Sequence, residues 1–441
     1  MLYLETVGSR IFTWFGAAAV VALAATSFDV RAQALPQEVQ AGTRNIIDFE
    51  FDWGQDGVYC PTCNYGGGNN RLSFVETDGT VWVGYVDPDT GYFLPKDGHG
   101  VKIDVNAVPA QTIGNGPEWM VSQRGSELVY TRYLDNKPKT FNNLSVGFAH
   151  AGNGSWVAGT MPDTQGFVLP VGSRNLADPL TLVHYQNFSK TSTDVYWRPV
   201  KQDSVATELT IGSHQPGVTR RWVPGTNKII LTYPAAPDAT GRVYRQVFLY
   251  STGDGTTQQL TFDPTNKYWA FMWQAPEYNN DYVFFALVGN AEIQIYRNTA
   301  KGSGTPNWKS FNKIVSTSAL PYIDSPEPFV HNGKSYMFFS VTATLAGHDV
   351  SASSQIAMTG IDPAHPSFRI LTSDTPNVRS RRDPEYYITS NGPYIYYNRY
   401  VAIVDQPGKA VSEGVFRVDT GLGPPVGQIS ARTAKAIRSM R

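Results

Sequence analysis

Three glutamates stand directly after a proline in three similar segments of the chain, which makes them candidates for acid–base chemistry. Glu118 lies in GPEWMVSQRGSELVYTR, Glu327 in SPEPFVHNGKSYMFFS and Glu385 in DPEYYITSNGPYIYYNR. Carboxylates that converge on one point repel each other, which raises some of their pKa values and creates an acid/base pair or a site for a divalent cation. The alternative is structural: each glutamate hydrogen-bonds the backbone of a neighbouring strand.

Charged residues of both signs crowd the same positions. They are Arg381, Arg382 and Asp383 before Pro384, and Arg220 and Arg221 at the matching place of another segment. A ring of opposite charges is what the binding of an anionic or polyhydroxylated ligand needs. Ion pairing of these arginines with the nearby carboxylates is the structural alternative.

Histidine and cysteine supply further candidates. His184, in LVHYQN, is either a base or metal ligand, or a hydrogen-bonded core histidine. The other histidines show neither HxH nor HExxH spacing, so the cofactor stays unknown unless the carboxylates hold a divalent cation. Cys60 and Cys63 form a CxxC pair, but zinc needs four ligands and no second pair exists. Glycines follow the pair where a redox motif has a helix, so we expect a local disulfide in an exported chain.

The composition indicates a globular, all-β protein. The chain has 441 residues, 41% hydrophobic and 17% charged, which is enough to bury a sizeable core. Its formal net charge of -1 offers no field that would gather nucleic acid or anionic lipid. The 24 Tyr, 22 Phe and 10 Trp, together with 40 Gly and 29 Pro, are typical of many short strands joined by tight turns.

The N-terminal residues differ from the rest of the chain. An apolar run from Ile11 to Ala25 follows Arg10, and Ala32-Gln33-Ala34 gives a small-x-small pattern before Leu35. We interpret residues 1–34 as a cleaved export signal, which places the mature chain in the periplasm or outside the cell. A membrane anchor is the alternative, although the run is shorter than the roughly 20 residues that a spanning helix needs. We expect no membrane insertion of the mature chain.

A repeat organises the chain after the leader. Between Leu35 and Val426, apolar residues alternate or form short runs, which is typical of strands. The repeating segments contain a proline or aromatic anchor followed by a turn and an apolar run. The anchors are Trp119, Trp222, Trp273, Pro328 and Tyr386, separated by 103, 51, 55 and 58 residues. Because the first gap is about twice the second, weaker units belong near residue 170 and near residue 68, which makes about seven units.

A period of roughly 50 residues with three or four strands per unit predicts a β-propeller, because small sheets hide their faces by packing around a ring. We therefore expect a single propeller over residues 35–426, with about seven blades, or six if one unit is incomplete. We expect NIIDFEFDW, Asn45 to Trp53, to complete the last blade and close the ring. Residues 427–441 are expected to form a tail or terminal helix outside the repeat.

The junction LYSTGDGTTQQLTFDPTNKYWAFMW resembles the blade junction of TolB-type (WD40-like, PD40 repeat) propellers. There, a strand ends in Leu-Thr and the next blade begins at an aromatic residue. The Ser-Pro-Asp-Gly turn of that family is replaced here by VSQRG, VPGTN, VHNGK and ITSNG, so the resemblance is distant. It implies that the three glutamates lie near the central channel. The family contains a periplasmic scaffold, oligogalacturonate lyases and the non-catalytic domain of prolyl-oligopeptidase-like enzymes, so it does not specify function.

Two functions fit these observations. The first is an exported propeller that binds a ligand or an envelope-protein partner at its channel mouth. The second is a carbohydrate-active enzyme, either a polysaccharide lyase or a glycoside hydrolase, that uses the channel carboxylates. DSPEPFVHNGKSYMFFS also resembles the blade starts of arabinanase-like glycosidases, and 13% aromatic residues suit the binding of an oligosaccharide. A serine peptidase has no support, because no Gly-x-Ser-x-Gly elbow follows the repeats.

Overall fold

A computed structural model describes most of the chain after the leader. The described residues are 35–52, 70–109, 116–152, 155–179, 181–187, 195–199, 207–208, 219–300, 305–345, 349–374, 376–406 and 408–426. The export signal, the cysteine pair and the C-terminal tail lie outside these ranges, so those three interpretations stay predictions. No helix within the described ranges is long and apolar enough to cross a bilayer.

The described strands form seven antiparallel sheets, and their order along the chain is the order of the repeat. Sheet 1 contains β2 (Ile46–Phe51), β3 (Arg71–Glu76), β4 (Val81–Val86) and β5 (Phe93–Leu94), with β6 (Val101–Asp104) also paired to β4. Sheet 2 contains β7 (Glu118–Ser122), β8 (Gly125–Tyr133), β9 (Leu144–Gly152) and β10 (Ser155–Thr160). Sheet 3 contains β11 (Phe167–Gly172), β12 (Leu182–Asn187), β13 (Val195–Pro199) and β14 (Thr207–Glu208).

Four further sheets complete the set. Sheet 4 contains β15 (Thr219–Trp222), β16 (Lys228–Pro234), β17 (Arg245–Ser251) and β18 (Thr257–Gln259). Sheet 5 contains β19 (Lys267–Ala275), β20 (Asp281–Val288), β21 (Glu292–Asn298) and β22 (Trp308–Val315). Sheet 6 contains β23 (Tyr322–His331), β24 (Lys334–Thr342), β25 (Ser354–Gly360) and β26 (Arg369–Ile370). Sheet 7 contains β27 (Arg379–Thr389), β28 (Gly392–Ala402), β29 (Ala410–Asp419) and β1 (Val39–Gln40). Within the described ranges, two 3-10 turns, η2 (Phe141–Asn143) and η3 (Pro276–Tyr278), lie in connections.

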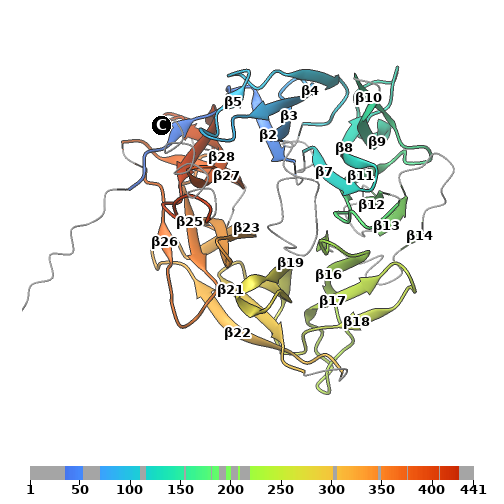
Figure 1. Ribbon diagram of the computed structural model, residues 1–441, viewed down its shortest axis with the longest axis vertical. Helices are drawn as coiled ribbons and strands as arrows, with labels where there is room; N and C mark the ends of the chain where they lie inside the picture. Colours follow the sequence, from blue (N-terminus) through green and yellow to red (C-terminus); the bar gives the residue numbers. More distant parts are fainter. Residues whose placement is uncertain are drawn as a thin grey trace, which may run out of the picture. The chain divides into compact units, whose positions relative to one another are not determined.

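The sheets are arranged around a common centre as a β-propeller, so the predicted fold class is confirmed (Figure 1). Apart from β1, the first strand of each sheet along the chain is its innermost strand, as β7, β19 and β23 show in Figure 1. The predicted anchors lie in these strands, and three of them join neighbouring sheets, among them Trp273, whose Nε1 donates to Ser335 Oγ (3.1 Å). Trp119 Nε1 donates to the Glu50 carbonyl oxygen (3.1 Å), and Trp222 Nε1 donates to the Val171 carbonyl oxygen (2.8 Å). Each tryptophan therefore fills the space between two sheets without leaving its N–H unpaired.

β-bulges interrupt several innermost strands beside the predicted site. Register shifts occur between Asp324 and Glu327 in β23 and between Arg382 and Glu385 in β27. Both strands begin several residues before the proline. The proline lies inside the bulge because it has no N–H to donate to the strand ladder.

The ring closes in a way that the sequence reasoning did not foresee. β2 is the innermost strand of sheet 1 and does not complete the last blade, because Phe51 packs on Tyr387 and Tyr396 of sheet 7 from a separate sheet. Sheet 7 is completed instead by Val39 and Gln40, which pair with β29. Two segments from opposite ends of the described chain thus form one sheet.

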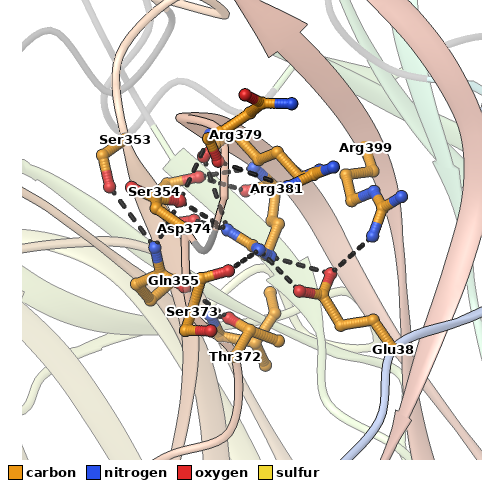
Figure 2. Close-up of polar contacts among 12 residues, drawn as sticks. Glu38, Ser353, Ser354, Gln355, Thr372, Ser373, Asp374, Arg379, Arg381 and Arg399 are labelled. Carbon is orange, nitrogen blue, oxygen red and sulfur yellow. Dashed lines mark hydrogen bonds and ion pairs between the residues drawn. The ribbon is translucent and has the colours of Figure 1, made fainter.

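Glu38 fixes this closure through ion pairs (Figure 2). Its carboxylate accepts from Arg381 Nη2 at 2.6 Å and Nε at 3.0 Å, and from Arg399 Nη1 at 3.2 Å. The Arg381 side chain is completely buried and also contacts Asp374 at 3.2 Å. Burial raises the pKa of Glu38, but the hydrogen bonds and charge of Arg381 outweigh burial and hold this pKa below its ordinary value.

Glu38→Gln should lower the free energy of unfolding at neutral pH by about 3 kcal/mol, because it leaves the buried Arg381 without its main counter-charge. The lowered pKa of Glu38 means that its contribution is present above pH 4.5 and is lost as the pH falls further. Urea denaturation at pH 7 and pH 3.5 measures both effects. Asp281→Asn is the control, since Asp281 pairs with Arg297 on the exposed surface. Equal stability of wild type and Glu38→Gln at pH 7 would show that the ion pairs do not fix the closure.

Candidate functional site

The structure brings Glu118, Glu327 and Glu385 together at the centre of the propeller. They lie in β7, β23 and β27, which are innermost strands of three different sheets. Their charges influence one another: Glu118 raises the pKa of Glu327, and both raise the pKa of Glu385. The repeat therefore places these carboxylates in one site, which we call the central site.

Acids that the sequence reasoning missed join the central site. Asp48 and Glu50 come from β2, and Asp324 precedes the bulge of β23. Asp48 lies so close to Gly116 that a Cβ atom on Gly116 would be 2.2 Å from the Asp48 carboxylate. Only glycine allows this approach. The alternation of acids with apolar residues in NIIDFEF was the available signal, but it was assigned to the wrong sheet.

Arginines partly balance these acids. Arg174, which follows β11, contacts Glu50 at 3.1 Å and Glu118 at 3.5 Å. Arg382 contacts Asp324 at 3.6 Å. Arg174 was not predicted from the sequence either, because its repeat unit matches the others least well.

Four side chains of the central site lack the hydrogen bonds and ion pairs that their neighbours make, although the Arg221 guanidinium lies over the Trp269 ring. Within the described ranges, Glu327, Asp383, Glu385 and Arg221 make no side-chain hydrogen bond or ion pair. Glu385 is nevertheless only 9% exposed. Arg221 is subject to the charges of Glu118 and Glu327, which raise its pKa against the opposing effect of burial. A charged group held in this way is unusual in a purely structural role.

Burial and repulsion shift the carboxyl groups toward their neutral forms. Burial, with the charges of Glu118 and Asp383, raises the pKa of Glu327 to about 7, although Arg221 and Arg174 oppose the shift. Burial and Glu118 raise the pKa of Asp383 to about 6. The pKa of Glu385 is well above its ordinary value because of burial and the charge of Glu327. Burial and Asp383 act on Asp48 in the same direction. Carboxyl groups of this site can therefore take up and release protons near neutral pH.

Trp269 lies beside the central site and was not predicted. It stands at a register shift in β19, its φ is 45°, and it is 44% exposed. The guanidinium of Arg221 lies 5.8 Å from the centre of its ring. Sequence reasoning chose Trp273 as the anchor of this segment, and Trp273 is indeed buried. The bulge turns the other tryptophan toward solvent.

Two predicted site residues have supporting positions. His184 is buried, stacks on Trp222 with ring centres 5.6 Å apart, and accepts a hydrogen bond at Nδ1 from Arg220 Nε (2.9 Å). Burial and the charges of Arg220 and Arg221 hold the pKa of His184 well below its ordinary value, so the ring is neutral. Arg220 also donates to the Leu169 carbonyl oxygen at 2.9 Å. His184 therefore orients Arg220, and its Nδ1 is not available as a base.

Arg381 is not part of the central site. Its guanidinium points into the contacts around Glu38 and Asp374 that close sheet 7 (Figure 2). Adjacent residues in a strand project to opposite faces, which separates Arg381 from Arg382. Our expectation that Arg381 binds ligand is replaced by its observed role in ring closure.

The central site has no preformed arrangement of metal ligands. Among the residues that the structure describes, no group of three or more His, Cys, Asp or Glu side chains is placed to hold a metal ion. The carboxylates come from different sheets and influence one another through charge. The divalent cation that we considered from the sequence stays a prediction.

Comparisons with known proteins describe the fold. No family model and no curated protein sequence matches the chain. Among solved structures, TolB from Acinetobacter baumannii is 13% identical, with a TM-score of 0.35, and the match covers 80% of this chain and 79% of TolB. The β-propeller domain of Myceliophteria thermophila Cps50 (Swd1) is 10% identical, with a TM-score of 0.45, covering 88% of this chain and 99% of that domain.

A sialidase from Trypanosoma rangeli, solved in complex with sialic acid, is also similar. It is 10% identical, with a TM-score of 0.38, and the match covers 80% of this chain and 57% of the sialidase. The chain is a β-propeller that has TolB and a Swd1 propeller among its distant structural neighbours.

Proposed function

We propose that this propeller binds a small polar ligand at the central site. The observation that carries the proposal is the set of charged side chains that make no hydrogen bond or ion pair with a described residue: Glu327, Asp383, Glu385 and Arg221. Of these four side chains Glu385 is buried, and a ring built for stability alone would pair it or replace it with an apolar residue, because a buried charge without a counter-charge is costly. Perturbed carboxyl groups that gather in one place support a binding or catalytic role.

A carbohydrate-active enzyme is the second candidate, and the pKa values favour it. A carboxyl group with a pKa of about 7, such as Glu327, can donate a proton to a leaving group at neutral pH. Asp383, with a pKa of about 6, is the matching candidate base. The exposed ring of Trp269 offers a surface on which a sugar can stack.

The proposed setting follows from the leader-like residues 1–34. An exported propeller would act in the periplasm or outside the cell, where an envelope protein is a further candidate partner. Such a protein would dock on the outside of the ring or at the channel mouth. Ligand binding at the central site does not depend on this partner.

Glu327 allows a test of whether the central site is structural or functional. Its raised pKa means that the folded protein holds this proton more tightly than the unfolded chain. The contribution of Glu327 to stability therefore falls as the pH rises from about 4.5 to about 7. Glu327→Gln should remove this loss. The free energy of unfolding of the variant, taken relative to that of wild type, should therefore be about 1–3 kcal/mol higher at pH 8 than at pH 5. Urea denaturation at the two pH values measures the change.

Asp281→Asn serves as the control for this comparison, because Asp281 lies on the exposed surface of β20. It should leave the pH dependence unchanged. If Glu327→Gln is less stable than wild type at pH 8, the carboxylate has a structural partner and the functional interpretation of Glu327 fails.

A screen by thermal denaturation tests ligand binding directly. A panel of neutral and charged oligosaccharides, amines and small organic acids is added to the purified protein. A ligand of the central site should raise Tm for wild type, since binding stabilises the folded state, and this shift should disappear in Arg221→Ala. Asp281→Asn should retain the shift. The proposal fails if no compound on the panel shifts Tm in an Arg221-dependent way.

Assays on pectin, arabinan and xylan separate the enzyme from the binding protein. If the enzyme candidate is correct, Glu327→Gln and Asp383→Asn should each reduce depolymerisation by about 10²–10⁴-fold while Tm does not fall. Asp281→Asn should keep full activity. Inactivity of the wild type on all three substrates would reject this second candidate for them and leave the binding proposal in place.

A further inference from the structure

The two ring nitrogens of His99 both contact carboxylates. Nδ1 lies 3.0 Å from Asp97 Oδ2, and Nε2 lies 2.9 Å from Glu76 Oε1. A neutral imidazole has one N–H and one lone pair, whereas the imidazolium ion donates from both nitrogens. The observed contacts therefore need the protonated ring, because a lone pair that faces a carboxylate oxygen is repelled by it.

His99 belongs to the connection between β5 and β6, residues 95–100, which we call the His99 loop. Gly98 of this loop takes the left-handed conformation, with a φ of 84°. A Cβ atom on Gly84 of β4 would lie 2.3 Å from the Gly98 carbonyl oxygen, and a Cβ atom on Gly98 would lie 2.8 Å from the Phe74 ring. Only glycine allows these approaches, so the loop lies directly on the face of sheet 1.

The His99 loop covers aromatic side chains between sheets 1 and 7. The His99 ring packs edge-on against Trp82 and Phe74, with ring centres 4.5 Å and 5.7 Å apart. Phe74 belongs to the buried cluster that includes Tyr387 and Tyr396 of sheet 7, and the partly buried Trp82 packs against this cluster. Because the ring closes between these two sheets, the loop lies over the closure.

Glu76 gives the loop a fixed partner on the sheet. It ends β3, is 9% exposed, and accepts a second hydrogen bond from Trp82 Nε1 at 3.1 Å. Asp97 lies in the loop itself, and its side chain is 51% exposed. Its Oδ1 accepts a hydrogen bond from the His99 backbone N–H at 3.1 Å. The His99 ring therefore connects a carboxylate of the sheet with a carboxylate of the loop.

We propose that the His99 loop is a pH-sensitive cover over the junction of sheets 1 and 7, closed while His99 is protonated and released when His99 loses its proton. The neutral ring keeps at most one of its two carboxylate contacts. The contact that remains is weaker, because the imidazole no longer carries a charge. Release of the loop exposes Trp82 and Phe74 to solvent. This device is separate from ligand binding at the central site.

The cover should open as the pH rises. Burial lowers the pKa of His99, but the hydrogen bonds and charges of Asp97 and Glu76 outweigh burial and hold this pKa above its ordinary value. The contribution of His99 to closure is therefore complete below pH 6.5 and is lost as the pH rises further. Beside these groups, the Lys102 ammonium of β6 lies 5.6 Å from the centre of the Trp82 ring. Lysine side chains titrate well above this range.

Hydrogen exchange of the loop amides measures the opening. The Gly98 N–H donates to the Pro95 carbonyl oxygen at 2.7 Å, and the Gly100 N–H donates to the Gly98 carbonyl oxygen at 2.8 Å. Both amides are protected only while the loop is closed. Their protection factors, corrected for the intrinsic pH dependence of exchange, should fall about tenfold between pH 5.5 and pH 8.5, since a charge-assisted hydrogen bond is replaced by a neutral one. The amides of β20 should keep their protection.

His99→Gln tests the role of the proton, because glutamine can donate one hydrogen bond to Glu76 but does not become charged. The loop of this variant should be protected about tenfold less than wild type at pH 5.5 and equally at pH 8.5. Asp97→Asn, a milder change at an exposed side chain, should move the midpoint of opening to lower pH, since His99 loses a charge that favours its proton. His365→Gln is the matched control, because His365 contacts Asp362 at 2.7 Å on the exposed surface. It should behave like wild type.

Three results would overturn the proposal. The first is equal protection of the wild-type loop at the two pH values, and the second is a His99→Gln variant that keeps the pH dependence of wild type. The third is a loss of protection that the amides of β20 share, because the whole propeller would then unfold and the cover would not open alone. Titration of the His99 ring by NMR should give the same midpoint as hydrogen exchange, and a different midpoint would assign the opening to another group.

Discussion

Every sheet of this propeller depends on its two neighbours, because neither of its faces can be buried by its own strands. The ring must therefore close, and a short segment at the start of the described chain closes it. Val39 and Gln40 supply only two paired residues, so backbone pairing alone stabilises the closure weakly. The Glu38 carboxylate also accepts hydrogen bonds from the buried Arg381 and from Arg399. These hydrogen bonds replace the water that would otherwise surround the charged groups. The costly burial of Arg381 becomes favourable only in the closed ring.

Closure also creates the central site. A ring directs the first strand of every sheet toward one axis, so residues far apart in sequence meet there. Asp48 and Asp383 are separated by most of the chain, yet the charge of one raises the pKa of the other. The bulges of β23 and β27 add to this effect, because they interrupt the ladder beside Glu327 and Glu385. The fold thus concentrates like charges that a less constrained chain would separate.

The repeat was visible in the sequence because its anchors are large and regularly spaced. Trp119 and Trp222 could be aligned, and the convergence of Glu118, Glu327 and Glu385 followed from that alignment. What could not be predicted depends on backbone irregularity or on long-range pairing. Trp269 turns outward at a register shift, and no residue type in KYWAFMW predicts that shift. The pairing of Val39 with β29 joins positions for which the sequence contains no common signal.

The two arginines of RSRRDPE show how one residue of register decides a role. Arg381 is buried against Glu38, whereas its neighbour Arg382 reaches Asp324 beside the central site. Sequence reasoning treated them alike because both are basic and adjacent to the same proline. The strand separates them, since neighbouring side chains leave opposite faces. One arginine is therefore used to hold the ring closed and the other to limit the repulsion that closure produces. Because β27 carries both arginines, substitutions in this strand affect both the stability of the ring and the central site.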